Sequence, residues 1–200
     1  GASSTPFLVS AWMKGIRDFD IETAFEGLKK NHLPGGMMAH AGYEHKSTKW
    51  GGVKQYIKKG FLPYPLRPFA PPWILHKEGA GQTLEYAYQD FCLAQLAKKL
   101  EKKDDYENFI KRSQNYRNLY NPETGWMHPK NRRGRWKRNY DPFKYKAGFV
   151  ESNGAQMTWS VPHDYHGLAE LMGGKDSLIP KLNSAFEKAQ EFGFTSGKAH

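Results

Sequence analysis

The chain has 200 residues, of which 38% are hydrophobic and 14% aromatic, and it carries 30 Lys and Arg against 20 Asp and Glu. So many bulky apolar groups exclude a disordered, solvating chain. No window approaches the roughly 18 uninterrupted apolar residues that a membrane-spanning helix needs. The length fits one domain or part of a larger one.

The cysteine count and the first residues restrict the chemistry further. Cys92 is the one cysteine, which excludes an intrachain disulfide and means that any zinc site would need His and carboxylate ligands. The chain starts at Gly1 with neither a Met nor a basic-then-apolar leader. We therefore expect a processed or excised chain.

The first predicted elements are two helices within residues 6–31. Apolar residues recur at helical spacing on both, and Asp20 is a plausible N-cap for the second. Residues 35–72 then lack periodicity and are rich in Gly and Pro, apart from a short helix expected at 53–59. A loop of that length is uncommon in a compact domain unless it builds a site, so we expect something to bind near it.

The strongest helix is predicted over residues 82–100. Apolar residues surround it except for a narrow polar stripe through Glu85 and Gln89, so it should be an internal helix. Asp104 and Glu107 then resemble a capping box, which predicts an outer partner helix. Together the two helices would form a second hairpin.

The last third of the chain predicts loops followed by another helical hairpin. Residues 120–136 are compatible with a short β-hairpin, and residues 151–164 resemble a loop. A helix over 163–172 and a second one, capped by Asp176 with Pro180 in its first turn, would follow. The expected fold is mainly α: helical hairpins that form part of a solenoid or toroid, without the fixed repeat of a tetratricopeptide array.

Much of the net charge of +10 comes from one short window. Residues 130–146 hold eight Lys or Arg against a single acid, a net +7. Four interleaved aromatic residues would permit base stacking beside phosphate contacts: Trp136, Tyr140, Phe143 and Tyr145. No motif of a nucleic-acid module accompanies them, so we expect a solvated loop and no nucleic-acid partner.

Glu151 is the candidate for acid–base chemistry. It lies in a polar loop between Phe149 and Trp159, where a carboxylic acid among aromatic groups would be placed to give a proton to a leaving group. The alternative is a loop Glu that pairs with a Lys or caps a helix. Composition alone favours this alternative.

Two groups contain the residue types that bind metals: His163, Asp164 and His166, and His40, Glu44 and His45. Neither group has a recognised zinc spacing. Asp164 is more simply the N-cap of the helix that follows it. We therefore expect both groups to be structural or to lie at the surface.

Four sequence runs in order resemble the catalytic region of glycoside hydrolase family 92: LPGGMMAHAGYEH, TLEYAYQDFCLAQLAKKL, YNPETGWM, and ESNGAQMTWSVPHD with the GLAELMGG that follows. The resemblance runs from about Phe7 to the C-terminus and is most specific over 151–174. Family members are calcium-dependent, exo-acting α-mannosidases of bacteria and some fungi, built from a β-sandwich and an (α/α) toroid. The resemblance implies that residues 1–200 form a single, incomplete segment of that toroid.

The resemblance also implies roles for individual residues. Glu151 falls where the family has its general acid. Six further residues match the two most specific motifs and would bind the sugar or support its pocket: Gln156, His163, Asp164, Glu85, Tyr86 and Asp90. The family's Gly-Asn-Glu-Pro and Gly-Asn-Asp-Asp segments, which supply calcium contacts and the catalytic base, do not occur here. We therefore expect this chain alone to bind no calcium and to be inactive.

The function implied by the resemblance is hydrolysis of α-linked mannose from glycans, with inversion and with α-1,2 linkages as the expected substrate. The complete enzyme would be periplasmic or secreted and would hold calcium, and the remainder of its chain would be this segment's partner. Two alternatives stay open: another toroid glycosidase, and a non-catalytic helical module that binds a phosphorylated glycan or nucleic acid through residues 130–146.

Overall fold

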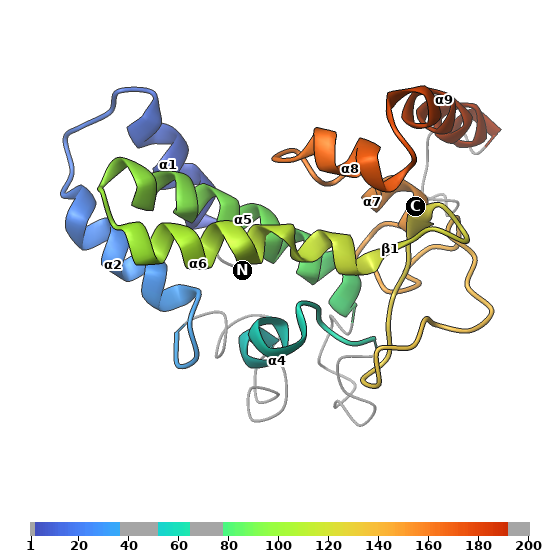
Figure 1. Ribbon diagram of the computed structural model, residues 1–200, viewed down its shortest axis with the longest axis horizontal. Coiled ribbons are helices and arrows are strands. Elements are labelled where there is room, and N and C mark those ends of the chain that lie inside the picture. The colour runs from blue at the N-terminus through green and yellow to red at the C-terminus, as the bar shows by residue number, and fades with distance from the viewer. Residues whose placement is uncertain (1–2, 37–51, 65–77, 192–200) are drawn as a thin grey trace.

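A computed structural model describes residues 3–36, 52–64 and 78–191 (Figure 1). The predicted group of His40, Glu44 and His45 lies outside these residues. The described helices are α1 (Ser4–Met13), α2 (Ile21–Asn31), α4 (Gly52–Lys59), α5 (Gly79–Lys99), α6 (Lys103–Ser113), α7 (Gly154–Met157), α8 (Tyr165–Leu171) and α9 (Lys175–Glu191), with the 3₁₀ helix η2 (Gln114–Leu119) after α6. The fold is mainly helical, as predicted.

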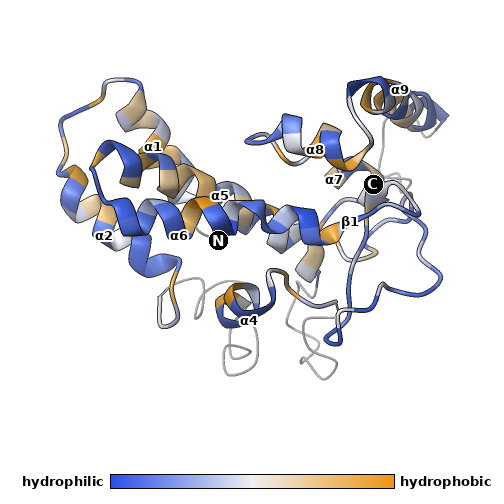
Figure 2. Cartoon of the chain, viewed as in Figure 1, coloured by the Kyte–Doolittle hydropathy of each residue, from blue (hydrophilic) through white to orange (hydrophobic). Residues whose placement is uncertain are grey.

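Helix α5 is the internal helix that its composition predicts. Of its 21 residues 14 are buried, and it contacts α1, α2, α6 and η2. Figure 1 shows α5 and α6 running side by side, with α1 and α2 at one end, α8 above the other end and α9 further out. The hydropathy colouring of Figure 2 shows apolar residues on α1 and α5, whereas the exposed loops are hydrophilic. The polar stripe of α5 is therefore an exception within an apolar helix.

Two apolar clusters share α5. The helical cluster holds side chains of α1, α2, α5 and α6, including Val9, Phe25, Leu93, Leu96 and Phe109. The loop cluster lies at the opposite end of α5 and includes Leu84, Leu119, Met127, Phe149 and Leu168. Because one helix contributes to both clusters, it fixes the position of the loop-rich end relative to the helical end.

The predicted β-hairpin is confirmed as a short two-stranded sheet. Strands β1 (Tyr120–Asn121) and β2 (Trp126–Met127) are antiparallel, with Tyr120 opposite Met127. Thr158 then joins the sheet to α7: its hydroxyl accepts from the Met127 N–H at 2.9 Å and donates to the Gly154 carbonyl at 2.7 Å. The segment predicted as a loop therefore contains one helical turn, which packs on β2.

The predicted helix starts are partly confirmed. Asp20 caps α2 through hydrogen bonds from the N–H groups of Glu22 and Thr23. Asp104, in contrast, lies inside the first turn of α6, because the chain reverses at Glu101 in the left-handed region (φ 58°) and the helix begins at Lys103. The capping-box prediction is therefore wrong, although acidic groups in a first turn still favour the helix dipole.

Helix α9 also differs from the prediction. It begins at Lys175, so Asp176 lies within its first turn and does not precede the helix. Pro180 is the sixth residue, which places it in the helix interior and not in the first turn. Because proline has no N–H, the carbonyl of Asp176 lacks the donor that a regular helix would give it.

Candidate active site

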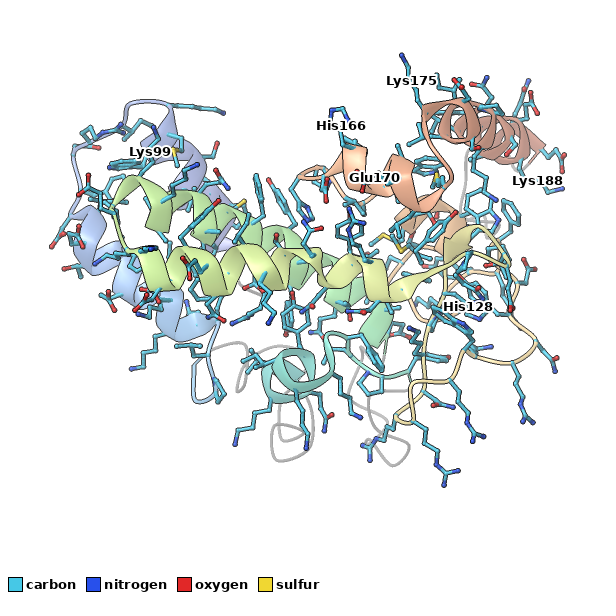
Figure 3. The ribbon with its side chains drawn as sticks, in the orientation of Figure 1. Lys99, His128, His166, Glu170, Lys175 and Lys188 are labelled. Atoms are coloured by element: carbon cyan, nitrogen blue, oxygen red, sulfur yellow. The ribbon has the colours of Figure 1, made fainter. Side chains whose placement is uncertain are left out.

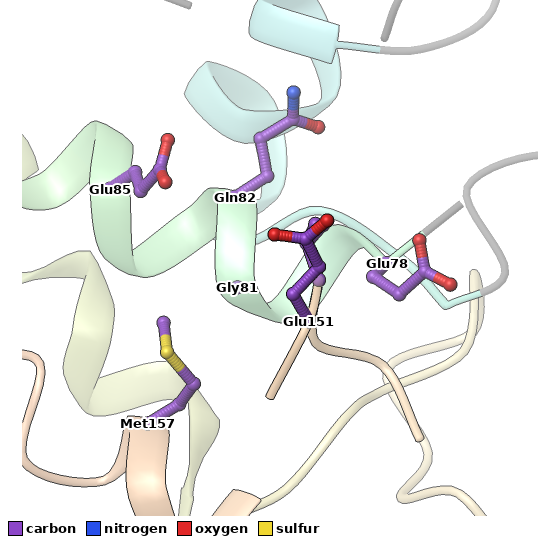
Figure 4. Close-up of a pocket in the computed structure, with 7 residues that line it drawn as sticks. Glu78, Gly81, Gln82, Glu85, Glu151 and Met157 are labelled. Carbon is purple, nitrogen blue, oxygen red and sulfur yellow. The ribbon is translucent and has the colours of Figure 1, made fainter. Parts of the chain in front are cut away.

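A cavity of about 250 Å³ opens between the N-terminal half of α5 and the segment that leads into α7 (Figure 4). Its lining residues are Glu78, Gly81, Gln82, Glu85, Val150, Glu151 and Met157. Three of them are carboxylic acids. The cavity lies just below the roughly 300–1,000 Å³ of most small-ligand sites, and its converging polar groups make it a candidate site for a small polar ligand.

Helix α5 forms one wall. Gln82 and Glu85 are three residues apart and project from the same side of the helix, while Glu78 lies just before its first turn (Figure 4). The start of the helix is fixed by a close approach at Gly79: a Cβ there would lie 2.5 Å from the Pro63 carbonyl oxygen and 2.7 Å from that of Leu62. The wall therefore rests on the backbone that follows α4.

The loop that carries Glu151 forms the opposite wall. The Gly81 N–H of α5 donates to the Gly148 carbonyl at 3.2 Å, and the Lys146 N–H donates to the Ser152 carbonyl at 2.9 Å. Phe149, between these anchors, is fully buried in the loop cluster. Main-chain bonds and one aromatic anchor thus fix the loop against α5.

Glu151 itself adopts a backbone conformation that side chains rarely take. Its φ is 48°, in the left-handed region, which costs a non-glycine residue roughly 1–2 kcal/mol. Strain of this kind concentrates at functional sites, where the surrounding structure imposes it. Among the described residues its carboxylate makes no ion pair, and the cap of α7 is Asn153. The alternative of a salt-bridging or capping Glu has no counterpart in this part of the chain.

Neither Gln156, which lies beside this loop, nor His163, which lies against α5 and η2, lines the cavity. Gln156 is exposed, and its side-chain oxygen accepts from the Ser152 hydroxyl at 3.1 Å, next to Glu151. His163 donates from Nε2 to the Ser113 carbonyl at 3.0 Å, and its ring lies among those of Tyr88, Phe91 and Tyr116. Burial lowers the pKa of His163, so its neutral form is favoured.

Asp164 is the predicted N-cap of α8. One carboxylate oxygen accepts from the Gly167 N–H at 2.8 Å, and the other accepts from the Tyr116 hydroxyl at 2.7 Å. Burial alone would raise the pKa of Asp164, but these hydrogen bonds and the nearby Arg117 outweigh it and lower the pKa. The residue therefore ties α8 to η2.

Tyr86 and Asp90 are buried in the helical interior. Tyr86 is 2% exposed and packs edge-to-face on Tyr56 with ring centres 5.4 Å apart. Asp90 is fully buried: His32 Nδ1 lies 2.8 Å from one of its oxygens, and Arg112 Nε and the Tyr56 hydroxyl lie 2.9 and 3.0 Å from the other. The geometry gives Asp90 a structural role, and contact of either residue with sugar stays a prediction from the resemblance.

The Asp90 network, which sequence reasoning missed, contains an arrangement that resembles a catalytic triad. The Thr5 hydroxyl lies 2.9 Å from His32 Nε2, whose other nitrogen meets Asp90. This is the order of nucleophile, base and orienting acid. All three residues are 0% exposed, so a substrate does not reach the hydroxyl and the arrangement serves stability.

Of the seven predicted site residues, the cavity brings together Glu151 and Glu85. Sequence reasoning missed Glu78, Gln82 and Met157, which share the cavity with them. One signal existed for Gln82, since it precedes Glu85 by three residues on the polar stripe of an otherwise apolar helix. The described residues contain no group of three or more His, Cys, Asp or Glu able to hold a metal ion.

Comparison with known proteins identifies the family. The model of the glycosyl hydrolase family 92 catalytic domain matches residues 1–199. The chain belongs to this family. Its structure is similar to that of a family GH92 inverting mannosidase from Bacteroides thetaiotaomicron VPI-5482, with a sequence identity of 38% and a TM-score of 0.76. The match covers 90% of this chain and 22% of the mannosidase.

Two further relatives agree. A family GH92 α-mannosidase from Bacteroides thetaiotaomicron gives 30% identity and a TM-score of 0.73, over 90% of this chain and 21% of that one, and its structure has also been solved with mannoimidazole. An uncharacterized secreted glycosidase from Arthroderma benhamiae (strain ATCC MYA-4681 / CBS 112371) is 24% identical over 92% of this family 92 chain and 26% of its own length. The chain thus spans about a quarter or less of these relatives. None of its described helices is both long and apolar enough to cross a membrane.

Proposed function

We propose that this family 92 chain supplies the general acid of a mannosidase that removes α-linked mannose from glycans. The observation that carries the proposal is the placement of Glu151. A strained loop, bonded through its main chain to α5, places this carboxylic acid at a cavity lined by Gln82 and Glu85. The similarity to solved mannosidases supports the choice of sugar.

In the proposed reaction, Glu151 gives its proton to the glycosidic oxygen as the bond to the anomeric carbon breaks. A water molecule attacks that carbon from the opposite face, which inverts its configuration, and a base takes a proton from the water. Inverting glycosidases separate the two carboxyl groups by roughly 6.5–9.5 Å to leave room for this water. Because the family's base segment does not occur in this sequence, the base would come from another part of the enzyme.

The other cavity residues would hold and orient the sugar. The Gln82 amide both donates and accepts hydrogen bonds, and the carboxylates of Glu78 and Glu85 accept them from hydroxyl groups. Met157 supplies an apolar surface opposite these groups, as Figure 4 shows. Such a combination suits a sugar, which has polar edges and apolar faces.

Three finer points belong to the same proposal. We expect α-1,2-linked mannose as the substrate and inversion as the stereochemical outcome. The fungal relative is a secreted glycosidase, which supports an extracellular location. Calcium is expected from the family resemblance alone, since the described residues hold no cluster of His, Cys, Asp or Glu that would bind a metal ion.

The decisive experiment replaces Glu151 with Gln in the intact protein. Glu151→Gln keeps the shape of the side chain but removes the transferable proton, so turnover of a mannoside with a poor leaving group should fall by roughly 10²- to 10⁴-fold. An activated phenolate leaving group needs little protonation, so its turnover should fall much less. Glu187→Gln, at an exposed position on α9, is the matched control and should leave both rates unchanged.

Equal losses on the two substrates would show that Glu151 acts in binding or folding and would overturn the proposal. A second measurement concerns the chain on its own. We expect the 200-residue chain to release no mannose and to show no calcium binding by calorimetry. Clear turnover by this chain would mean that it contains a base that the proposal places elsewhere.

A further inference from the structure

Residues 130–136, the first part of the basic window predicted from the sequence, form a hairpin whose arginines are exposed. Lys130 pairs with Trp136 in an isolated antiparallel bridge, and the Asn131 side chain accepts from the N–H groups of Arg133 and Arg135. Gly134 closes the turn in the left-handed conformation, with φ 77°. The turn is therefore fixed by its own hydrogen bonds, and its arginine side chains are exposed.

This hairpin is joined to α4, which is also basic. Lys59 Nζ donates to the Arg132 carbonyl at 3.0 Å, and the Tyr64 N–H donates to the Lys130 carbonyl at 2.7 Å. Six exposed cations lie on the two joined elements and are called the basic face here: Lys54, Lys58, Lys59, Arg132, Arg133 and Arg135. The two segments, which are far apart in the sequence, together form a cationic surface.

The charge of the basic face is not balanced locally. Residues 52–64 and 128–140 contain nine Lys and Arg and no Asp or Glu. Among the described residues, no ion pair joins Lys54, Lys58, Arg133 or Arg135 to a carboxylate. Clustered charge of one sign raises the local concentration of ligands of the opposite sign.

Three of the four aromatic residues of the window are used for internal packing. Lys130 Nζ lies 4.1 Å from the centre of the Trp136 ring, which it covers. Tyr140 stacks on His128 with ring centres 4.1 Å apart and donates its hydroxyl to the Met127 carbonyl, and Phe143 packs against Trp126. Single-stranded nucleic acids are held by open aromatic surfaces on which bases stack. These three rings do not offer such surfaces.

We infer that the basic face binds a glycan that carries phosphate or sulfate groups, at a site separate from the cavity. The inference rests on the proposed function, because a glycosidase meets glycans as its substrates. Arginine pairs bind phosphate and sulfate oxygens through several hydrogen bonds at once. The basic face would then retain a charged glycan while another of its branches enters the cavity.

The test uses the intact protein and four probes: neutral mannan, phosphorylated mannan, chemically sulfated mannan and duplex DNA. The three mannans have the same chain length, and the DNA has a similar mass. Arg133→Glu with Arg135→Glu reverses two charges of the basic face. Lys103→Glu with Lys175→Glu makes the same change in charge at the starts of α6 and α9, where acidic residues suit the helix dipole. Lys175 is labelled on α9 in Figure 3.

The charged mannans should bind more tightly than neutral mannan. Raising the salt concentration from about 50 to 200 mM should lower their affinity several-fold. The arginine variant should lose roughly tenfold in affinity, with the lysine variant unchanged. A preference between the phosphorylated and sulfated probes identifies the group that is recognised. Equal binding of neutral and charged mannan, equal losses in both variants, or tighter binding of DNA would overturn the inference. Hydrolysis of a neutral mannoside, measured in parallel, tests the proposed function separately.

Discussion

In the C-terminal half of α5, Asp90 is fully buried and both of its carboxylate oxygens are bound by neighbouring side chains. In the N-terminal half of the same helix, Glu85 is exposed at a cavity that it shares with Glu78 and Glu151. The two carboxylates are five residues apart, yet they face different surroundings. The helical end binds its buried carboxylate internally, and the loop end exposes its carboxylates at a cavity.

The contrast follows from what each end of α5 packs against. At the helical end, α1, α2, α4 and α6 contribute Thr5, His32, Tyr56 and Arg112, so one buried carboxylate holds four elements together. At the loop end, the neighbour is a strained loop whose backbone bonds leave the Glu151 side chain exposed. The surroundings of each carboxylate, and not its place on the same helix, therefore decide whether it is bound internally or exposed.

Removing the buried carboxylate of Asp90 should cause the largest loss of unfolding free energy among the variants considered. Asp90→Ala leaves the Arg112 guanidinium, which is 7% exposed, without its counter-charge, and such changes cost about 3–5 kcal/mol. Urea unfolding of the chain measures the loss. Glu107→Ala, on the exposed side of α6, is the control and should change stability by less than about 0.5 kcal/mol.

A double variant sharpens the same test. Replacing both partners, with Asp90→Leu and Arg112→Met, removes the unbalanced charge and should recover part of the lost stability. If the double variant loses as much unfolding free energy as Asp90→Leu and Arg112→Met lose in sum, or more, the ion pair is not what stabilises the helical end.

Adding a methyl group at Gly154, at the start of α7, tests how closely the loop end is packed. In Gly154→Ala the added Cβ would lie 2.8 Å from the Met127 carbonyl oxygen and closer still to the Tyr140 hydroxyl, so we expect a loss of about 1–3 kcal/mol. Gly27→Ala, inside α2, has no neighbour within 4 Å of the new Cβ and should stabilise the chain by about 0.5–1 kcal/mol. Thermal unfolding compares the two, and equal effects would contradict the close packing of α7 on β2.

The smallest expected effect concerns Asp164, which ties α8 to η2 within the loop end. Asp164→Ala removes the cap of α8 and should cost about 1 kcal/mol at pH 7. Because the folded pKa of Asp164 is lowered from 3.8, its contribution is present above that pH and is lost as the pH falls through the lower folded value. Unfolding at pH 7 and at successive values below 4 should therefore show the difference shrinking.

Asn is a suitable control at this position because it also caps helices well. Asp164→Asn should keep most of the stability at pH 7 but lack the acid-dependent loss attributed to this carboxylate. An Ala variant whose deficit stays constant down to the lowest pH would show that the charge of Asp164 does not matter.

The secondary structure could be predicted largely from periodicity, whereas some helix starts could not. The apolar circumference of α5 identifies it as internal, and Asp20 and Asp164 precede their helices as caps should. Asp104 has the same sequence pattern, but the left-handed turn at Glu101 starts α6 earlier. Local patterns name the residues that are able to cap a helix, and the turn before them decides where the helix begins.

The site was harder to predict because its residues meet through the fold. Glu85 and Glu151 come from distant segments, and the bond between Gly81 N–H and the Gly148 carbonyl that joins those segments has no side-chain signature. The resemblance named both residues, but Glu78 and Gln82 belong to the cavity through the path of α5 alone. The Asp90 network escaped prediction for the same reason, since its members come from separate helices.

The main-chain anchoring of the Glu151 loop leaves one side chain of the cavity wall free to change. The bonds of Gly81 to Gly148 and of Lys146 to Ser152 involve backbone atoms, so they persist when the side chain of Val150, which lines the cavity, is exchanged. The shape of the cavity can therefore vary at this position while Glu151 keeps its place. A library randomised at Val150, screened on different mannose linkages, would explore substrate preference without moving that carboxylate.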